Sequence, residues 1–256
     1  MRTIDFSTLL YRWLQLAGLD RSSITAATYA QFRDLANGRL ETIWKSDRWP
    51  ALIRITTPPG DTVITDANDV LTVTLGSDVG EVLGVYDQDP RLTTRAKLVK
   101  YFLYDSGSVS YVNFMEPVDD VFIEYNTRKP ELFGDAWSAT STYSVGAQAY
   151  FDTSTSTGAF IPSSTKQPAG NLYTCLVATT ANQSPSNTPA SWDLVEIPYF
   201  TGEYIVRGAL SDYLRSEGQF QQAVIAESDA ETARIAEVDR VLTTEGQVKR
   251  INMFTY

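Results

Sequence analysis

Hydrophobic residues in the first fifty positions recur every three or four residues, which is the period of an amphipathic helix. The apolar positions are Leu9, Leu10, Trp13, Leu14 and Ala17, then Tyr29, Phe32, Ala36, Leu40, Ile43 and Trp44. They predict two helices joined as a hairpin. We expect Gly18 to end the first helix and Ser22, Ser23 or Thr25 to cap the second. The Trp-Pro pair at 49–50 should end the second helix, because proline disfavours helix in the residue before it.

Between residues 51 and 129 the hydrophobic period changes to two, which is typical of short, half-buried strands. The strand-like runs are 52–55, 70–75, 81–86, 109–112 and 121–125. Turn-forming residues separate them at 58–60, 66–69, 87–90 and 105–107. The pattern therefore predicts a small antiparallel β domain over residues 51–134.

The composition then shifts to Ser, Thr, Ala and Tyr, with almost no charge between Asp135 and Val195. Runs at 148–151 and 172–177 are strand-like, and glycines and prolines interrupt the sequence around them. This indicates a separate, loop-rich β module over residues 135–198.

The helical period returns after Pro198, at Tyr204, Gly208, Tyr213 and Leu214 before Gly218, and then at Phe220, Val224, Ile235, Val238, Val241 and Leu242. Two more helices are expected, with a stop at Gly246. The predicted fold class is α+β. Both chain ends, 1–50 and 199–246, would form an antiparallel helical bundle, from which the inserted β domain and the small β-rich module project.

Residues 247–256 carry apolar side chains without a helical stripe. They suit an arm that adds to a strand edge or groove of a partner, or a tail that packs on its own subunit, and the pattern leaves both open. The candidate arm residues are Lys249, Arg250, Ile251, Met253, Phe254 and Tyr256.

Composition excludes several classes of function. The 256 residues carry a net charge of -10, which opposes sequence-specific binding to nucleic acid. Histidine is absent, which removes the usual general base and the commonest transition-metal ligand. The single cysteine, Cys175, cannot form an internal disulfide, so a reducing cytoplasm fits best. Neither a signal peptide nor a membrane span is expected.

The acidic pairs Asp66/Asp69, Asp87/Asp89 and Asp119/Asp120 stand at predicted turns, where Asp is favoured for its local hydrogen bonds. We therefore expect no catalytic residue and no metal. No glycine-rich phosphate motif is present, and no cofactor is expected. The basic stretch from Arg91 to Lys100 precedes Tyr101, Phe102 and Tyr104, and a solvated strand edge is favoured over a single-strand binding site.

Several stretches carry a resemblance in order and spacing: LANGRLETIW at 35–44 leading to RWPAL at 48–52, VYDQDPR at 85–91, VFIEY at 121–125 and GALSDYLRSEGQ at 208–219. Together they resemble the adaptor family of phage head-to-tail connectors. The resemblance implies a ring of about twelve copies under the portal protein. The bundle would line the DNA channel, and the arm would hold portal subunits.

A second resemblance covers residues 136–195, through Ala136-Trp137, YSVG at 143–146, Tyr150, LYTCL at 172–176 and SPSNTPASW at 184–192. This segment is similar to the chitin- and cellulose-binding modules of carbohydrate-binding families 5 and 12, in which aromatic rings stack on sugars. The candidate sugar-binding residues are Trp137, Trp192, Tyr143, Tyr150 and Tyr173. For the two tryptophans, sugar contact and core packing are equally open, whereas core packing is favoured for the three tyrosines.

The sequence departs from this second family in two places. Ser184 stands where the family usually has Trp, and residues 153–170 are a long insertion. Both departures weaken the expected sugar platform.

The expected function is therefore that of a structural virion protein and not of an enzyme. It would be an adaptor ring that joins the portal to the tail, including the tail nozzle or other tail proteins, and continues the DNA channel. It would be assembled in the host cytoplasm and located at the head-tail interface. The alternative is a host-surface adhesin or virion protein that binds a host glycan through residues 135–198.

Overall fold

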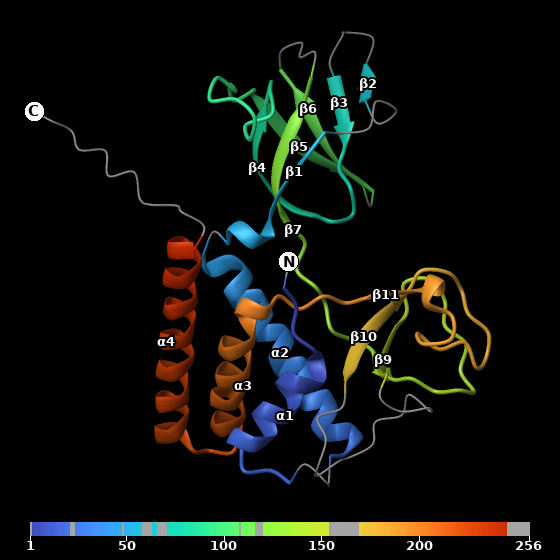
Figure 1. The fold of residues 1–256 in the computed structure, drawn as a ribbon, viewed down its shortest axis with the longest axis vertical. Coiled ribbons are helices and arrows are strands. Elements are labelled where there is room, and N and C mark those ends of the chain that lie inside the picture. Colours follow the sequence, from blue (N-terminus) through green and yellow to red (C-terminus); the bar gives the residue numbers. More distant parts are fainter. Residues whose placement is uncertain are drawn as a thin grey trace, which may run out of the picture. The chain divides into compact units, whose positions relative to one another are not determined.

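The computed structural model describes residues 2–20, 24–47, 49–57, 63–65, 71–107, 109–115, 120–153 and 169–244. Over these residues the fold is α+β, with four α-helices and three sheets that are mostly antiparallel (Figure 1). The chain divides into two compact units. We call Met1–Arg48 with Pro130–Tyr256 the helical unit, and Trp49–Lys129 the β unit.

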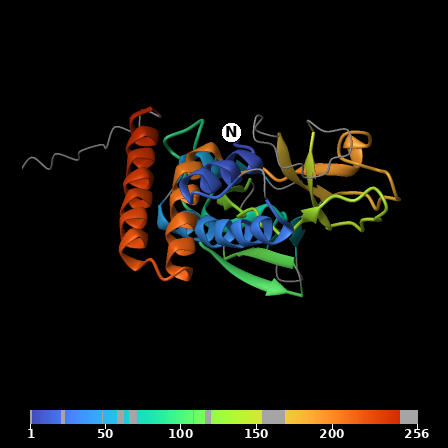
Figure 2. The ribbon, with the colours of Figure 1, turned by 90° about the horizontal axis from the view of Figure 1, so that it is seen from below.

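The helical unit contains α1 (Phe6–Leu16), α2 (Ala26–Ser46), α3 (Gly202–Ser216) and α4 (Phe220–Thr244). Helix α3 packs against the other three, and both ribbon views show α4 on the outer side of α3 (Figures 1 and 2). All four helices were predicted from the hydrophobic period.

Glycines end α1 and α3 in the same way. Gly18 and Gly218 have φ angles of 68° and 77°, in the left-handed region that favours glycine. The residue after each glycine donates its N–H back into the helix, from Leu19 to Leu14 at 2.9 Å and from Gln219 to Leu214 at 2.9 Å. The predicted stop at Gly18 is confirmed.

The predicted limits of α2 are also confirmed. Thr25 caps the helix, because its hydroxyl accepts the N–H of Thr28 at 3.1 Å. The helix ends at Ser46, and Trp49, before the proline, is extended.

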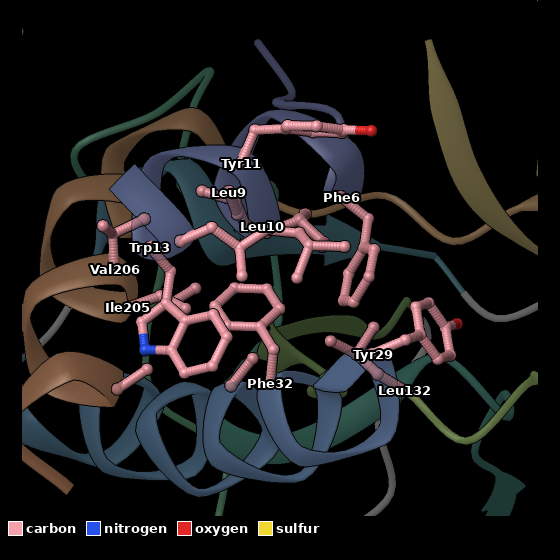
Figure 3. Close-up of a cluster of buried hydrophobic side chains, with 14 of the residues drawn as sticks. Phe6, Leu9, Leu10, Tyr11, Trp13, Tyr29, Phe32, Leu132, Ile205 and Val206 are labelled. Atoms are coloured by element: carbon pink, nitrogen blue, oxygen red, sulfur yellow. The ribbon is translucent and has the colours of Figure 1, made fainter. Parts of the chain in front are cut away.

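The main core of the helical unit is aromatic. The rings of Phe6 and Trp13, both on α1, lie 5.4 and 5.3 Å from the ring of Phe32 on α2, measured between centroids. Ile205 and Val206 reach the same cluster from α3 (Figure 3). The apolar positions that predicted these helices are therefore the ones that pack together in this core.

A four-stranded sheet completes the helical unit, in the order β11-β10-β9-β8. It consists of β8 (Asp135–Ala136), β9 (Gln148–Asp152), β10 (Gly170–Cys175) and β11 (Trp192–Leu194), and only the β8–β9 pair is parallel. Tyr150 and Leu172 point from β9 and β10 into the main core beside Phe6. The segment expected as a separate module thus shares a core with the helices and lies in the same compact unit.

The β unit contains two antiparallel sheets, with strand orders β1-β7-β4 and β2-β3-β6-β5. Its strands are β1 (Ile53–Thr56), β2 (Val63–Thr65), β3 (Leu71–Thr74), β4 (Val79–Tyr86), β5 (Tyr101–Ser106), β6 (Val109–Phe114) and β7 (Phe122–Thr127). Val73, Val85, Val112 and Ile123 are buried in its core. The five predicted strands are confirmed as β1, β3, β4, β6 and β7, whereas β2 and β5 were not predicted. The basic stretch from Arg91 to Lys100, expected at a solvated strand edge, lies before the edge strand β5 and outside the named strands.

One buried cation joins three helices of the helical unit. The guanidinium of Arg39 on α2 donates to both carboxylate oxygens of Asp212 on α3, at 2.7 and 2.6 Å. It also donates to both oxygens of Glu227 on α4, each at 2.7 Å. Gly208 makes room for this side chain, because a Cβ there would stand 2.6 Å from Cδ of Arg39.

Over the described residues, no helix combines the length and the apolarity needed to cross a membrane.

We predict that Gly208→Ala lowers the free energy of unfolding by about 1–3 kcal/mol, because the new methyl group overlaps Arg39 and displaces it from its two carboxylates. The matched control is Gly38→Ala in α2, where a Cβ would meet no atom within 4 Å. The control should gain about 0.5–1 kcal/mol from helix propensity. Urea unfolding measures both, and equal effects would contradict the prediction.

Candidate functional site

The structure places two of the five candidate sugar-binding aromatics in the interior. Trp192 is 5% exposed and Tyr150 is 0% exposed. The ring of Tyr150 meets those of Phe6 and Tyr29 edge to face, at centroid distances of 6.1 and 5.3 Å. Both rings have their faces covered by protein. The hypothesis that Trp192 offers its face to a sugar is therefore corrected, and core packing, favoured for Tyr150, is what the structure shows.

The other three candidates are half-buried around a small cluster of Ala149, Cys175 and Trp192. Tyr143 lies edge-on to Trp192 at 5.2 Å, and Trp137 lies edge-on to Phe151 at 5.4 Å. Tyr173 packs against the same cluster. These aromatic side chains form the small core on the side of the sheet that faces away from the helices. A segment this small has few other large residues that could fill a core.

The buried indole nitrogens are the remaining polar feature of this cluster. Nε1 of Trp137 and Nε1 of Trp192 have no hydrogen-bond partner among the described residues. A buried donor left without an acceptor costs about 1–3 kcal/mol.

We predict that Trp192→Ala destabilises the helical unit by about 3–5 kcal/mol in the absence of any sugar, because it removes the largest side chain of a buried cluster. Val145→Ala in the same segment is the control, since Val145 is largely exposed and should change stability by less than about 0.5 kcal/mol. Thermal unfolding measures both. A wild-type melting temperature for Trp192→Ala would show that the ring is not a core residue.

The most unusual surface of the helical unit is on α4. Its side facing α3 is made mostly of small residues, and Ala223 and Ala230 are fully buried there. Three of its larger apolar residues are nevertheless exposed, Phe220 by 67%, Val224 by 65% and Ile235 by 53%, whereas Val241 is buried. A helix that packed only on its own subunit would bury the larger residues and expose the small ones.

These three exposed residues share one side of α4, with Phe220 and Val224 one turn apart and Ile235 three turns further along. At 100° per residue, Phe220, Val224 and Ile235 fall within about 60° of one another around α4. We call them the ridge. Residues 218–226, which include two of them, contain no charged residue in a chain that is 20% charged. Depletion of charge at an exposed apolar surface is characteristic of the centre of a protein interface.

A groove of about 350 Å³ lies between the end of α1, α3 and α4. Its apolar lining includes Leu16, Leu210, Leu214 and Ile225. The α4 residues Ala226 and Asp229 on its wall lie roughly opposite the ridge around the helix. At the rim, Arg207 pairs with Asp229 at 3.0 Å. The helical unit thus carries an exposed apolar ridge and a groove of mixed polar and apolar lining on different sides of one helix.

The acidic pairs take part in local structure where they are described. Asp89 pairs with Arg91 at 2.6 Å, and Asp87 accepts the N–H of Lys97 at 2.7 Å. Asp66, Asp69 and Asp119 lie outside the described residues, as do all the candidate arm residues, Lys249, Arg250, Ile251, Met253, Phe254 and Tyr256. Within the described ranges, no three potential metal ligands come together.

The sequence did not predict the ion pairs of Arg39 with Asp212 and Glu227, because these residues lie far apart in the chain. Burial alone would lower the pKa of Arg39, but its hydrogen bonds to Glu227 and Asp212 raise it. The same contact lowers the pKa of Glu227 below its ordinary value of 4.5. Arg39 and Glu227 are therefore both charged at neutral pH, and the network fastens α4 to α2 and α3.

This network predicts a pH dependence. Because the pKa of Glu227 is lower in the folded chain than in the unfolded one, its stabilising effect is complete above about pH 4.5 and is lost as the pH falls through the folded value. The difference in unfolding free energy between the wild type and Glu227→Gln should be constant from pH 7 to pH 5 and shrink below pH 4.5. Urea unfolding at each pH measures it, and a difference that grows on acidification would contradict the prediction.

No protein-family model matches the chain, and no curated protein matches its sequence significantly. The function is therefore argued from the residues and surfaces described above.

Proposed function

We propose that this chain is a structural virion protein, an adaptor whose copies form a ring that joins the portal to the tail and continues the DNA channel. In this proposal the helices of both chain ends form one antiparallel bundle. The β domain is inserted into the bundle, and residues 135–198 are a carbohydrate-binding-like module built onto it. The chain has no catalytic role.

The observation that carries the proposal is the apolar surface of α4. A closed ring needs one heterologous interface, in which two different patches on each copy meet and repeat until the ring closes. The ridge and the groove are two such patches, and they are distinct and lie on different sides of one helix. Fixed in place by the Arg39 network, α4 would present both to neighbouring copies.

Charge and composition support the same function. A net charge of -10 on each copy, multiplied around a ring, repels the DNA that passes through the channel and keeps the genome from adhering to it. Absence of histidine is unusual for an enzyme and of no consequence for a structural ring. The resemblance to connector adaptors covers both the helical and the β unit.

Glycan binding through residues 135–198 is less well supported. The Trp192 face is buried, Tyr150 belongs to the main core, and Ser184 stands in place of a third platform residue. A sugar platform needs exposed ring faces. We therefore regard the aromatics of this segment as structural in an adaptor.

The proposed partners are the portal protein on one side and the tail nozzle or other tail proteins on the other. Residues 249–256 are the proposed contact with the portal, as the resemblance implies. The ring would contain about twelve copies and would reside in the virion at the head-tail interface.

The test is the assembly state of the purified full chain, alone and with the portal protein of the same phage. We expect native mass spectrometry and negative-stain imaging to show closed rings, either spontaneously or on portal addition. Monomers under both conditions would overturn the proposal.

The ridge provides a sharper form of the test. Phe220→Ser with Val224→Asp should abolish ring formation while the melting temperature stays within a few degrees of wild type, because both side chains are exposed. Leu92→Asp, at an 85% exposed position in the β unit, is the control and should leave rings intact. Rings formed equally well by the ridge variant would remove the observation on which the proposal rests.

A further inference from the structure

Helix α4 stands apart from the main core of the helical unit. Among the described residues, that core takes side chains from α1, α2, α3, β9 and β10 but none from α4. The side chains that α4 buries include Ala223, Ala226 and Ala230, and Val241 is the largest of those described. Elements that bury few apolar groups open at a lower free energy than the rest of a fold. The main core therefore stays complete when α4 leaves.

Ion pairs fasten α4 to the rest of the helical unit. Each α4 residue in these pairs meets an opposite charge on α2, on α3 or directly after α2: Glu227 meets Arg39 and Arg215, Asp229 meets Arg207, and Arg234 meets Asp47. The hydroxyl of Ser211 on α3 also donates to the carbonyl of Ala223 at 2.9 Å. The surface beneath α4 is therefore complementary in charge to this helix, whichever copy supplies it.

The guanidinium groups of this surface keep a carboxylate when α4 is absent. Arg39 retains both hydrogen bonds to Asp212 of α3, at 2.7 and 2.6 Å. Arg215 retains Asp212 at 3.4 Å, and Arg207 retains Glu203 at 3.6 Å, all within α3. Because no guanidinium is left without a partner, the departure of α4 avoids the high cost of an isolated buried charge.

A short turn joins α3 to α4. Helix α3 ends at Ser216 and α4 begins at Phe220, so residues 217–219 form the hinge. Gly218 has a φ angle of 77°, and a Cβ there would meet no atom within 4 Å. The closed turn therefore depends on the conformational freedom of glycine and not on packing. An opened hinge does not need this left-handed conformation.

We propose that α4 is exchanged between copies: it leaves α3 of its own chain and packs in the same way on α2 and α3 of a second copy. The guanidinium groups of one chain then meet Glu227 and Asp229 of the other, so these ion pairs are remade between chains. Reciprocal exchange closes a dimer, and exchange in one direction continues from copy to copy. The exchange is a property of the chain alone, so it goes beyond the proposed function and does not require the portal.

The closed and exchanged forms contain the same contacts between α4 and its receiving surface. The closed form is favoured because the hinge holds its own helix at a high effective concentration. Strain in the hinge reduces that advantage, and so does an assembly in which copies are already held side by side. The balance between the two forms can therefore be shifted by a single residue of the hinge.

A pair of complementary charge reversals tests the exchange. Arg207→Asp and Asp229→Arg chains are purified separately, and each brings like charges together between its own α3 and α4. Exchange between the two chains restores opposite charges at both sites. With one chain isotopically labelled, native mass spectrometry of the equilibrated mixture should show mixed dimers in about tenfold excess over dimers of either chain alone.

The control is the pair of Arg12→Glu and Glu203→Arg chains, because this ion pair joins α1 to α3 and α4 takes no part in it. Their mixture should contain mixed and like dimers in the proportions expected by chance. Chance proportions for the Arg207 and Asp229 variants as well would overturn the proposal. The same conclusion would follow from a mixed excess that is equally large in the control.

The hinge gives an independent measurement. Gly218→Ala strains the closed turn, because alanine disfavours the left-handed conformation, and should raise the fraction of dimer about tenfold. The matched control is Gly18→Ala: its φ is 68° and a Cβ would again meet no atom within 4 Å, but this glycine ends α1. The control should lose stability without gaining dimer. Sedimentation velocity measures both variants, and equal dimer fractions would contradict the exchange.

Failure of this proposal can be told apart from failure of the proposed function. Rings that form on the portal from chains without any preference for mixed dimers would overturn the exchange and leave the adaptor function standing. Preferred mixed dimers from a chain that forms no rings, alone or with the portal, would overturn the adaptor function and leave the exchange standing.

Discussion

The ion-pair network of Arg39 is the contact on which the arrangement of the helical unit depends. Helix α4 offers α3 mainly alanines, so apolar burial between them is modest. The guanidinium of Arg39 is buried and joins both Asp212 and Glu227, so removing either carboxylate would leave a buried charge with one partner fewer. A helix fastened by charges on its inner side can keep several of its larger apolar residues exposed. The interaction surface of α4 is therefore a consequence of how α4 is held.

Local signals in the sequence predicted much of the fold. The helix limits at Gly18, Thr25 and Trp49 depend on neighbouring residues only, and so they can be read from the chain. Five strands of the β unit followed from alternation. Strand β2 has three residues, too few to show a period. The network of Arg39 joins residues more than 170 positions apart, which no local pattern reveals.

The candidate site was harder to predict, because burial depends on the whole fold. Trp192 and Tyr150 stand at positions that match a sugar-binding pattern, yet the first lies in the small cluster of the sheet and the second meets Phe6 in the main core. Conversely, the residues of the ridge were predicted as one helical stripe, and stripes normally face a core. Only the packing of α4 on α3 shows that part of this stripe is left outside.

The strand β9 is buried along its whole length, with Tyr150 facing the helices and Ala149 and Phe151 facing the far side of the sheet. Its neighbour β10 reaches α1 as well, through the N–H of Phe6 bonded to Asn171 at 2.9 Å and the N–H of Gly170 bonded to Ser7 at 3.0 Å. Residues 135–198 therefore cannot be transplanted as a cassette. Excising them would remove Tyr150 and Leu172 from the core that they share with α1 and α2. A homologue without this segment would need different residues at Phe6 and Tyr29, which contact Tyr150.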